Sequence, residues 1–231
     1  QRADRLDASR LTVQKRTMTS HPAPAHRGLL LSFEGIDGSG KSTQISLLTH
    51  ALRQRGHSVS VYREPGGTPL SEKIRDLLLD PAYEPDPVTE ILLFSAARSE
   101  LAARRILPDL EAGHVVILDR FFDSTTAYQG YGNGVLGEQA LESIHRLAAH
   151  ALVPGITFYL RIPIQHALRR LAAQEKDRIE SKDEAFFSRV VEGYEQLARR
   201  HRRFIPLDAL APVEQIHGEI LSHATRLLTS A

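Results

Sequence analysis

The 231-residue sequence contains no cysteine and no tryptophan. The absence of cysteine excludes disulfides, thiolate zinc sites and cysteine nucleophiles. Basic and acidic side chains nearly balance at a formal net charge of +1, so no overall field favours nucleic acid or a membrane surface. No apolar run approaches the roughly 18 residues that a membrane-spanning helix needs. We therefore expect neither nucleic acid nor a membrane as a partner.

Residues 1–27 differ in composition from the rest of the chain. They contain scattered arginine, serine and threonine with two prolines, and they show no sustained hydrophobic periodicity. Asp4 and Asp7 argue against a transit peptide, and the segment has no apolar core typical of a secretory signal. We predict a disordered leader over 1–27 and a single domain over 28–231, and we expect a cytoplasmic protein.

From Leu29 onward, short apolar runs alternate with stretches of helical periodicity. Strands are predicted at 29–33, 59–63, 115–119, 157–161 and 204–207, and helices at 42–55, 70–79, 88–112, 138–149, 164–173, 183–202 and 212–228. Ser181 and Glu184 have the spacing of a capping box, which predicts a helix start there. The alternation predicts an α/β fold with a five-stranded parallel sheet and helices on both faces. The ligand is expected at the carboxyl ends of the strands.

One contiguous motif follows the first predicted strand and precedes the first predicted helix. It fits the phosphate-binding pattern of a glycine, four residues, then Gly-Lys-Ser/Thr, and comprises Gly35, Ile36, Asp37, Gly38, Ser39, Gly40, Lys41, Ser42 and Thr43. Its glycines leave room for backbone N–H groups to surround phosphates, and the helix N-terminus adds partial positive charge. Lys41 is expected to reach the β and γ phosphates, and Ser42 to bind Mg²⁺. The motif predicts a P-loop NTPase with three layers that binds a nucleoside triphosphate.

The third predicted strand ends in Asp119 and Arg120. A carboxylate delivered beside a P-loop suits a Walker B aspartate, which would help to hold Mg²⁺, and Arg120 would then point at phosphate. The alternative interpretation of this pair is an ordinary salt bridge at a strand end.

Further motifs follow the P-loop in a fixed order. They are Arg63-Glu64-Pro65-Gly66-Gly67-Thr68, then Phe94-Ser95-Ala96-Ala97-Arg98, then Asp119-Arg120 with Ser124-Thr125-Thr126-Ala127-Tyr128-Gln129-Gly130, and finally Asp177-Arg178-Ile179-Glu180. Together with the P-loop, these segments resemble bacterial thymidylate kinases over about residues 30–209. The resemblance implies transfer of the γ-phosphate of MgATP to dTMP, and a homodimer joined through helices.

The resemblance also implies roles for individual residues. ATP would be bound by the P-loop residues 35–43, and Mg²⁺ by Ser42 and Asp119. The acceptor would be bound by Arg63, Glu64, Pro65, Phe94, Arg98, Arg120, Ser124, Thr125, Tyr128 and Gln129. Catalysis would depend on Lys41, Asp37, Arg120, Arg170 and Arg178. Asp37 need not act as a base, because the acceptor phosphate has a second pKa of about 6 and is mostly deprotonated at neutral pH.

The spacing and the chemistry of the side chains are consistent with these residues binding the acceptor. Phe94 and Arg98 are four residues apart and share a face on a helix, where a ring can stack on a base and a guanidinium can donate to it. Arg63 and Arg120 leave two strand ends and suit bidentate phosphate binding. A packed Tyr128 would leave no room for a ribose 2′-hydroxyl. The alternatives are a core role for Phe94, a solvated salt bridge for Arg98 and a core-closing role for Tyr128.

Residues 164–182 are predicted to form a short basic lid over the triphosphate. Arg169, Arg170, Lys176 and Arg178 lie in this stretch, although a solvated helix face is an alternative interpretation. Some thymidylate kinases have a basic residue inside the loop, whereas residues 38–40 here are Gly-Ser-Gly, so the lid would supply that cation. Arg161 departs from the family pattern, in which many relatives have an aspartate, and we assign no contact to it.

Two rival functions are compatible with a P-loop. A GTPase switch normally reads guanine with Asn/Thr-Lys-x-Asp, but none of the five lysines has aspartate two residues later. A kinase for UMP, CMP or AMP is nearer, and only Phe94, Arg98, Tyr128 and Gln129 argue against it. The preference for dTMP over dUMP depends on one methyl group, which typically contributes about 1 to 3 kcal/mol.

Overall fold

The computed structural model describes residues 28–135, 137–171 and 177–230. The predicted leader over 1–27 and Lys176 of the predicted lid lie outside the described residues. The five predicted strands are confirmed as β1 (Leu29–Glu34), β2 (Val59–Arg63), β3 (Val115–Asp119), β4 (Ile156–Arg161) and β5 (Phe204–Asp208). They form one parallel sheet in the order β2-β3-β1-β4-β5. The strand that leads into the P-loop therefore lies at the centre of the sheet.

Each predicted helix is present with small shifts at its ends. The helices are α1 (Lys41–Gln54), α2 (Pro69–Leu79), α3 (Pro87–Leu101), α4 (Leu107–Glu111), α6 (Glu138–Ala148), α7 (Ile164–Leu171), α8 (Glu184–Arg200) and α9 (Val213–Ser230). A π-helical segment, η1 (Ala102–Ile106), joins α3 to α4. Two further elements were not predicted, α5 (Phe122–Thr125) and a second π-helical segment, η2 (Thr126–Gly132).

The helix start predicted near residue 183 is confirmed, but the capping side chain is not Ser181. The first residue of α8 is Glu184, and the capping side chain is Asp183, whose carboxylate accepts from the backbone N–H of Phe186 at 2.7 Å. The Ser181 hydroxyl instead donates to the backbone carbonyl of Asp177 at 2.7 Å. Both residues are good cap formers, and the local turn at Asp177 decides between them.

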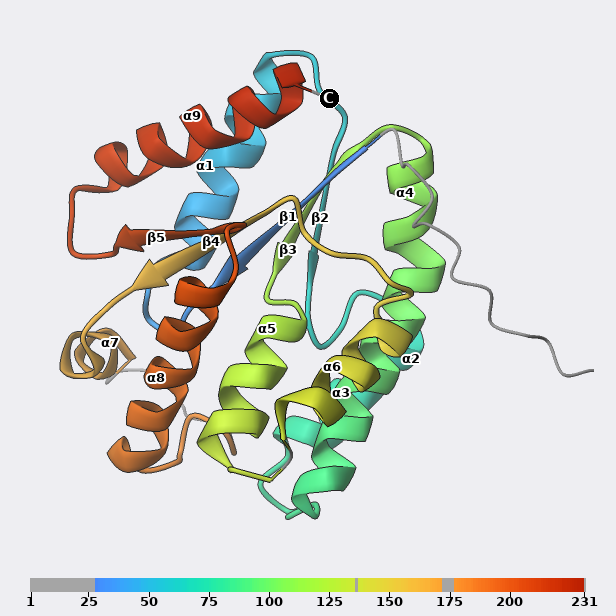
Figure 1. Cartoon of the computed structure of the whole chain (residues 1–231), viewed down its shortest axis with the longest axis vertical. Coiled ribbons are helices and arrows are strands. Elements are labelled where there is room, and N and C mark those ends of the chain that lie inside the picture. The colour runs from blue at the N-terminus through green and yellow to red at the C-terminus, as the bar shows by residue number, and fades with distance from the viewer. Residues whose placement is uncertain (1–27, 136, 172–176, 231) are drawn as a thin grey trace, which may run out of the picture.

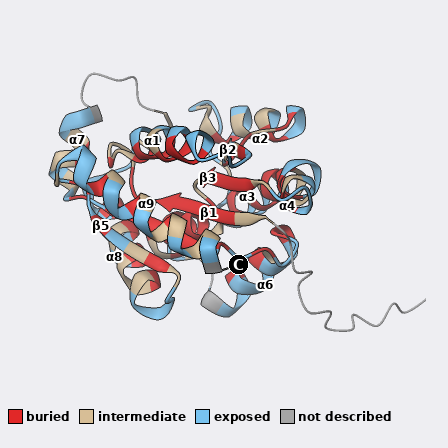
Figure 2. Cartoon of the chain, turned by 90° about the horizontal axis from the view of Figure 1, so that it is seen from above, coloured by how far each residue is buried: buried red, intermediate tan, exposed pale blue. Residues whose placement is uncertain are grey.

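Alternate residues of the central strands face two separate apolar cores. Leu31 and Phe33 of β1 pack with Leu48 of α1 in the larger core, whereas Leu30 packs with Ile106 of η1 in the second. This period-2 pattern, with both faces apolar, is what a parallel sheet covered on both sides requires. Figure 2 shows α1 on one side of the strands and α6 and α8 on the other. The predicted α/β sandwich is confirmed.

The carboxyl ends of the strands point toward the part of the molecule that carries α5, α7 and α8 (Figure 1). Parallel strands deliver the residues that follow them to one edge of the sheet, so the P-loop after β1 and Arg120 after β3 meet there. Among the described residues, no helix is long and apolar enough to cross a membrane.

Candidate active site

The P-loop is held open by glycine backbones. Gly35 and Gly38 have φ angles of +131° and +77°, a region that side chains rarely adopt. A Cβ at Gly38 would lie 2.8 Å from the carbonyl oxygen of Ala167 in α7, and one at Gly35 would lie 2.6 Å from that of Leu160. The loop therefore packs directly against backbone on both sides, and only glycine fits at these two positions.

Lys41 begins α1 and turns back over the loop. Its side chain is only 6% exposed, and Nζ donates to the carbonyl oxygens of Gly35 and Ile36 at 3.0 and 3.2 Å. Nζ also lies 3.6 Å from the Asp37 carboxylate. Burial and the nearby Arg120 lower the pKa of Lys41, while Asp37 opposes that shift. The ammonium is thus fixed at the mouth of the loop, where polyphosphate would bind.

Two cavities meet above the sheet edge. The larger, of about 650 Å³, is lined by the P-loop, and the smaller, of about 130 Å³, lies beside α3 and η2. Their common wall consists of Asp37, Glu64, Arg75, Arg120 and Glu180. A donor in one cavity and an acceptor in the other would therefore meet at these charged side chains.

The structure brings most of the predicted site residues to these cavities. The larger cavity is lined by Asp37, Gly38, Ser39, Gly40, Lys41, Ser42, Thr43, Arg63, Glu64, Asp119, Arg120 and Arg170. The smaller is lined by Asp37, Glu64, Pro65, Phe94, Arg98, Arg120, Ser124, Thr125, Tyr128 and Gln129. Gly35 and Ile36 contribute their carbonyl oxygens to Lys41 rather than a cavity surface.

Arg120 is the best-anchored side chain of the site. Its guanidinium donates to the Gly35 carbonyl, the Asp37 carboxylate and the hydroxyls of Ser124, Tyr128 and Tyr194, at 2.6 to 3.3 Å. Its backbone adopts a left-handed φ of +71°, which is strained for a residue with a side chain. The many bonds hold this conformation and aim the guanidinium at the boundary between the cavities.

Asp37 is an ionised carboxylate in this setting. Burial opposes ionisation, but Arg120 at 2.6 Å and Lys41 together outweigh it and hold the pKa of Asp37 well below its usual range. A carboxylate with so low a pKa is a poor proton acceptor at neutral pH. The geometry therefore agrees with a positioning role and argues against general base catalysis by Asp37.

The far end of the smaller cavity is built on a buried ion pair. Arg98 is 1% exposed and donates to Glu64 at 2.7 Å and to the Thr125 hydroxyl at 2.9 Å. Burial raises the pKa of Glu64 to about 7, although Arg98 opposes the shift. One Arg98 nitrogen, Nη1, has no hydrogen-bond partner within the described part of the chain. Arg98 is thus a buried partner of Glu64, so the alternative interpretation of a solvated salt bridge does not hold, while its role toward a base stays a prediction.

Phe94 and Tyr128 both take part in apolar packing and also line the smaller cavity. Phe94 is half-buried, packs against Leu78 and Ala97, and also lines the smaller cavity. Tyr128 belongs to the larger core and lies with its ring 5.0 Å from the Arg120 guanidinium carbon, again at the cavity wall. Core packing therefore fixes these two rings at the cavity wall.

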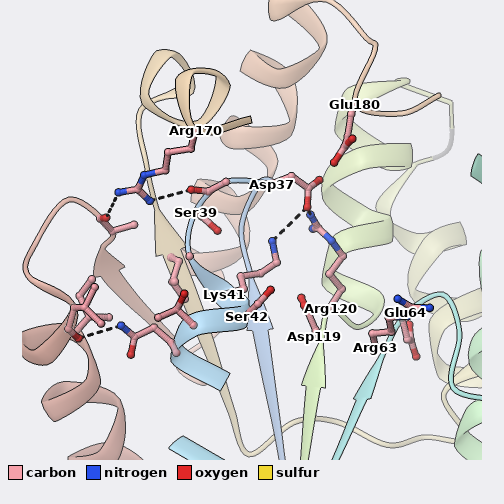
Figure 3. A pocket seen from close by; sticks show the side chains of 18 of the residues that line it. Asp37, Ser39, Lys41, Ser42, Arg63, Glu64, Asp119, Arg120, Arg170 and Glu180 are labelled. Carbon is pink, nitrogen blue, oxygen red and sulfur yellow. Dashed lines mark hydrogen bonds and ion pairs between the residues drawn. The ribbon is translucent and has the colours of Figure 1, made fainter. Parts of the chain in front are cut away.

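The two lid arginines lie in different places. Arg170 of α7 donates to the carbonyls of Gly38 and Ala209 at 2.9 and 3.3 Å, beside the P-loop (Figure 3). Arg178 instead forms a buried ion pair with Glu90 of α3 at 2.5 Å, and Glu90 also accepts from the Gln129 amide at 2.9 Å. The structure therefore does not bring Arg178 to the P-loop, because its guanidinium is held by Glu90 and by the backbone carbonyl of Leu78.

Ser42 and Asp119 face the same part of the larger cavity (Figure 3). The Oδ1 atom of Asp119 is buried without a hydrogen-bond partner among the described residues. Arg63 also lines this cavity and pairs with the exposed Glu72 at 3.0 Å. Arg161, left without a predicted contact, forms two bonds of 2.7 Å with Glu195 of α8, away from both cavities.

Four polar residues of the site were missed by the sequence analysis. Arg75 and Glu180 lie in the common wall of the cavities, Glu90 holds Gln129, and Glu34 lies buried behind Arg120. Glu180 belongs to the motif over 177–180 and Glu34 directly precedes the P-loop, and these positions were the only available signal for a role of either residue. Arg75 and Glu90 occur within helices and outside any motif, so their sequence context offered none.

Comparison with known proteins gives concordant results. Residues 33–220 match the family model described as Thymidylate kinase. The chain is 47% identical over 205 residues to the thymidylate kinase of Pelodictyon phaeoclathratiforme, covering 84% of this chain and 94% of that one. It is also 47% identical to that of Chlorobaculum tepidum, covering 87% and 99%. The crystal structure of thymidylate kinase from Ehrlichia chaffeensis superposes with a TM-score of 0.69 at 32% identity, covering 86% and 98%.

Proposed function

This chain belongs to the thymidylate kinase family, and we propose that the two adjoining cavities bind its donor and its acceptor. It transfers a phosphoryl group from ATP to dTMP, which gives dTDP and ADP. The observation that carries the assignment of the cavities is their common wall, where Arg120 and Asp37 lie between the P-loop and the Arg98 pocket.

The donor triphosphate lies along the P-loop in the larger cavity. Backbone N–H groups of the loop and the N-terminus of α1 face its β and γ phosphates. Lys41 Nζ exchanges its loop carbonyls for phosphate oxygens, and Arg170 approaches from the other side of Gly38. These cations neutralise the charge that spreads over the transferring group, which is the main catalytic contribution in phosphoryl transfer.

Magnesium fits the donor set that faces the larger cavity. The described residues contain no cluster of three or more His, Cys, Asp or Glu side chains that would hold a metal alone. Ser42 and the unpartnered oxygen of Asp119 supply two hard oxygen atoms, and phosphate oxygens and water would complete the octahedral shell that Mg²⁺ requires. When bound, the ion would neutralise negative charge on the phosphates.

The acceptor lies with its base in the smaller cavity and its phosphate at the common wall. Phe94 stacks on the ring, and Arg98 and Gln129 donate to its polar edge from fixed positions. Arg120 binds the acceptor phosphate, Arg75 adds positive charge at the same wall, and Arg63 adds positive charge from the larger cavity. The phosphate needs no base, because its second pKa of about 6 leaves it deprotonated at neutral pH.

We also propose a domain organisation, a location and an oligomeric state. Residues 28–231 form one kinase domain whose lid extends over about 164–182, and the enzyme works in the cytoplasm. A homodimer would bury Val88 and Leu92 of α3 with Leu147 of α6, which are 39%, 54% and 76% exposed. These two helices contact one another, and their exposed apolar side chains supply the face against which a second copy of the chain would pack.

The test is ADP release from MgATP with dTMP, dUMP, UMP, CMP or AMP at equal concentration. We expect dTMP to dominate, with dUMP lower by about 10- to 200-fold, because one methyl group contributes about 1 to 3 kcal/mol. Preference for another monophosphate would overturn the assignment of the smaller cavity. Acceptor-independent hydrolysis would overturn the placement of an acceptor at the common wall.

A further inference from the structure

Glu34 is a fully buried carboxyl group behind the common wall of the cavities. It is the last residue of β1 and directly precedes the P-loop. Its Oε1 accepts from the backbone N–H of Phe121 at 2.8 Å. Its Oε2 accepts from the hydroxyls of Ser124 and Tyr194 at 2.5 and 2.9 Å. No salt bridge to Glu34 forms within the described part of the chain, so hydroxyl and amide donors alone satisfy it.

The two hydroxyls that donate to Glu34 also accept from Arg120. Nη1 of Arg120 lies 3.1 Å from the Ser124 hydroxyl and 3.3 Å from that of Tyr194. A hydroxyl has one proton and two lone pairs. The two oxygens also lie 2.8 Å apart, so either hydroxyl can donate to the other instead. When both protons point at the Glu34 carboxylate, the lone pairs of both oxygens face Arg120. The charge on Glu34 therefore sets the orientation of the acceptors that hold the guanidinium.

We propose that Glu34 is a positioning residue for phosphoryl transfer, whose carboxylate orients Ser124 and Tyr194 so that they hold Arg120 against the acceptor phosphate. This inference rests on the proposed placement of the acceptor. Glutamine at this position can still accept from Phe121, but its amide NH₂ then faces the two hydroxyls. One hydroxyl can then donate to the other, since their oxygens lie 2.8 Å apart, but the remaining proton must turn toward Arg120, which loses an acceptor.

The ionisation of Glu34 falls in the neutral range. Burial and the neighbouring Asp123 raise its pKa to about 7, while Ser124, Arg120 and Phe121 oppose the shift. The other charged or titratable groups that act on it are Lys41 of α1, Tyr128 of η2 and Tyr194 of α8. Below this pKa the protonated carboxyl offers one acceptor fewer, so the support for Arg120 weakens as the pH falls.

The test measures dTMP and ATP kinetics of the full chain carrying Glu34→Gln. We expect kcat/KM for dTMP to fall about tenfold or more, since a hydrogen bond to a charged group contributes about 1.5 to 3 kcal/mol. The KM for ATP should change less than about twofold, because Lys41 and the loop N–H groups are untouched. In the wild type, kcat/KM for dTMP should fall as the pH decreases through about 7, and this decrease should be absent in Glu34→Gln. The variant should keep only the decrease near pH 6 that comes from protonation of the acceptor phosphate.

Tyr194→Phe tests the same hydrogen bonds from Glu34 to Arg120 without altering the charge on Glu34. Tyr194→Phe should reduce kcat/KM for dTMP by a smaller factor than Glu34→Gln does. The double variant Glu34→Gln with Tyr194→Phe should be no worse than Glu34→Gln alone, because both changes disrupt the same hydrogen bonds between Glu34 and Arg120. Tyr159→Phe is the matched control. Its ring stacks on Tyr194 at 5.1 Å, but its hydroxyl donates to Glu195 and not to Glu34, so its kinetics should equal those of the wild type.

The possible outcomes separate cleanly. Equal losses for ATP and dTMP, a retained decrease near pH 7 in Glu34→Gln, or multiplying losses in the double variant would each overturn the positioning role. If Glu34→Gln does not fold by circular dichroism, Tyr194→Phe decides the question through its ratio of dTMP to ATP effects. A wild-type enzyme that does not use dTMP would instead overturn the acceptor assignment.

Discussion

The P-loop binds through one contiguous stretch, residues 35–43, whereas the acceptor cavity is lined by side chains as far apart as Glu64 and Glu180. The loop works largely through backbone N–H groups and one lysine. The smaller cavity, assigned to the acceptor, is bordered by the buried ion pair of Arg98 with Glu64, and the largely buried pair of Arg178 with Glu90 holds Gln129 beside it. Removing one partner of a buried pair leaves an uncompensated charge. Substitutions in the acceptor half, around the smaller cavity, should therefore lower the free energy of unfolding and weaken dTMP binding together. Substitutions in the donor half, around the P-loop, should mainly lower kcat.

Lys41→Ala should give the largest effect and test the donor half. We expect kcat to fall by about 10³-fold, because the variant lacks a preorganised cation at the transferring phosphate. Circular dichroism should show a folded protein. Lys73→Ala is the matched control, since Lys73 is 82% exposed and pairs with Asp76 on the surface of α2. Turnover near the wild-type level in Lys41→Ala would refute the mechanism.

Arg98→Ala should affect the acceptor half in two ways. We expect about a 10²-fold loss in kcat/KM for dTMP with little change in the KM for ATP, since a buried charged donor is lost. The free energy of unfolding should also fall by about 3 to 5 kcal/mol, because Glu64 is left buried alone.

Adding Glu64→Gln to Arg98→Ala separates these two effects. Stability should recover in part, since no unpaired charge remains, while dTMP kinetics should not recover. Arg104→Ala, on the exposed side of η1, is the control and should change neither quantity. Equal losses for dTMP and ATP in Arg98→Ala would remove its role in binding the base.

Arg170→Ala should have a moderate effect at the edge of the donor half. The Arg170 side chain is exposed and bonds loop carbonyls at Gly38 and Ala209, so we expect about a tenfold fall in kcat with unchanged stability. Arg169→Ala is the neighbouring control, because that residue is also exposed on α7. An equal decrease in both variants would indicate a general charge effect rather than a directed contact.

His145→Gln should have the smallest effect, and it tests a buried polar group outside both cavities. Burial first, and Arg98 second, lower the pKa of His145 to about 3, so the folded protein keeps it neutral while the unfolded chain binds a proton below about pH 6.5. The stability that it contributes is present above pH 6.5 and is lost as the pH falls.

Between pH 6.5 and 5.5, the wild type should therefore lose about 1 kcal/mol of unfolding free energy relative to His145→Gln, as measured by urea titration. The raised pKa values of Glu34 and Glu64 are common to both proteins and cancel in the difference. The exposed His57→Gln is the control. Parallel pH profiles for wild type and His145→Gln would contradict the buried neutral state.

The same contrast explains which parts of the molecule could be predicted from sequence. The five strands and the P-loop were predictable, because apolar runs and glycine spacing are local signals. The η2 segment was missed, since Thr126-Ala127-Tyr128-Gln129-Gly130 has no helical periodicity and is held by packing against α8. The position of Arg178 was also unpredictable. Its partner Glu90 is 88 residues away in the sequence, so no local pattern predicts that the two side chains pair.

The half-buried ring of Phe94 has a practical consequence for spectroscopy. It lies at the wall of the smaller cavity, between the Leu78 and Ala97 side chains and the space assigned to the base. Because the chain has no tryptophan, Phe94→Trp would place a single indole there, which can be excited without exciting the tyrosines. Its emission would report dTMP binding in the absence of ATP, and acceptor affinity would become measurable without any turnover.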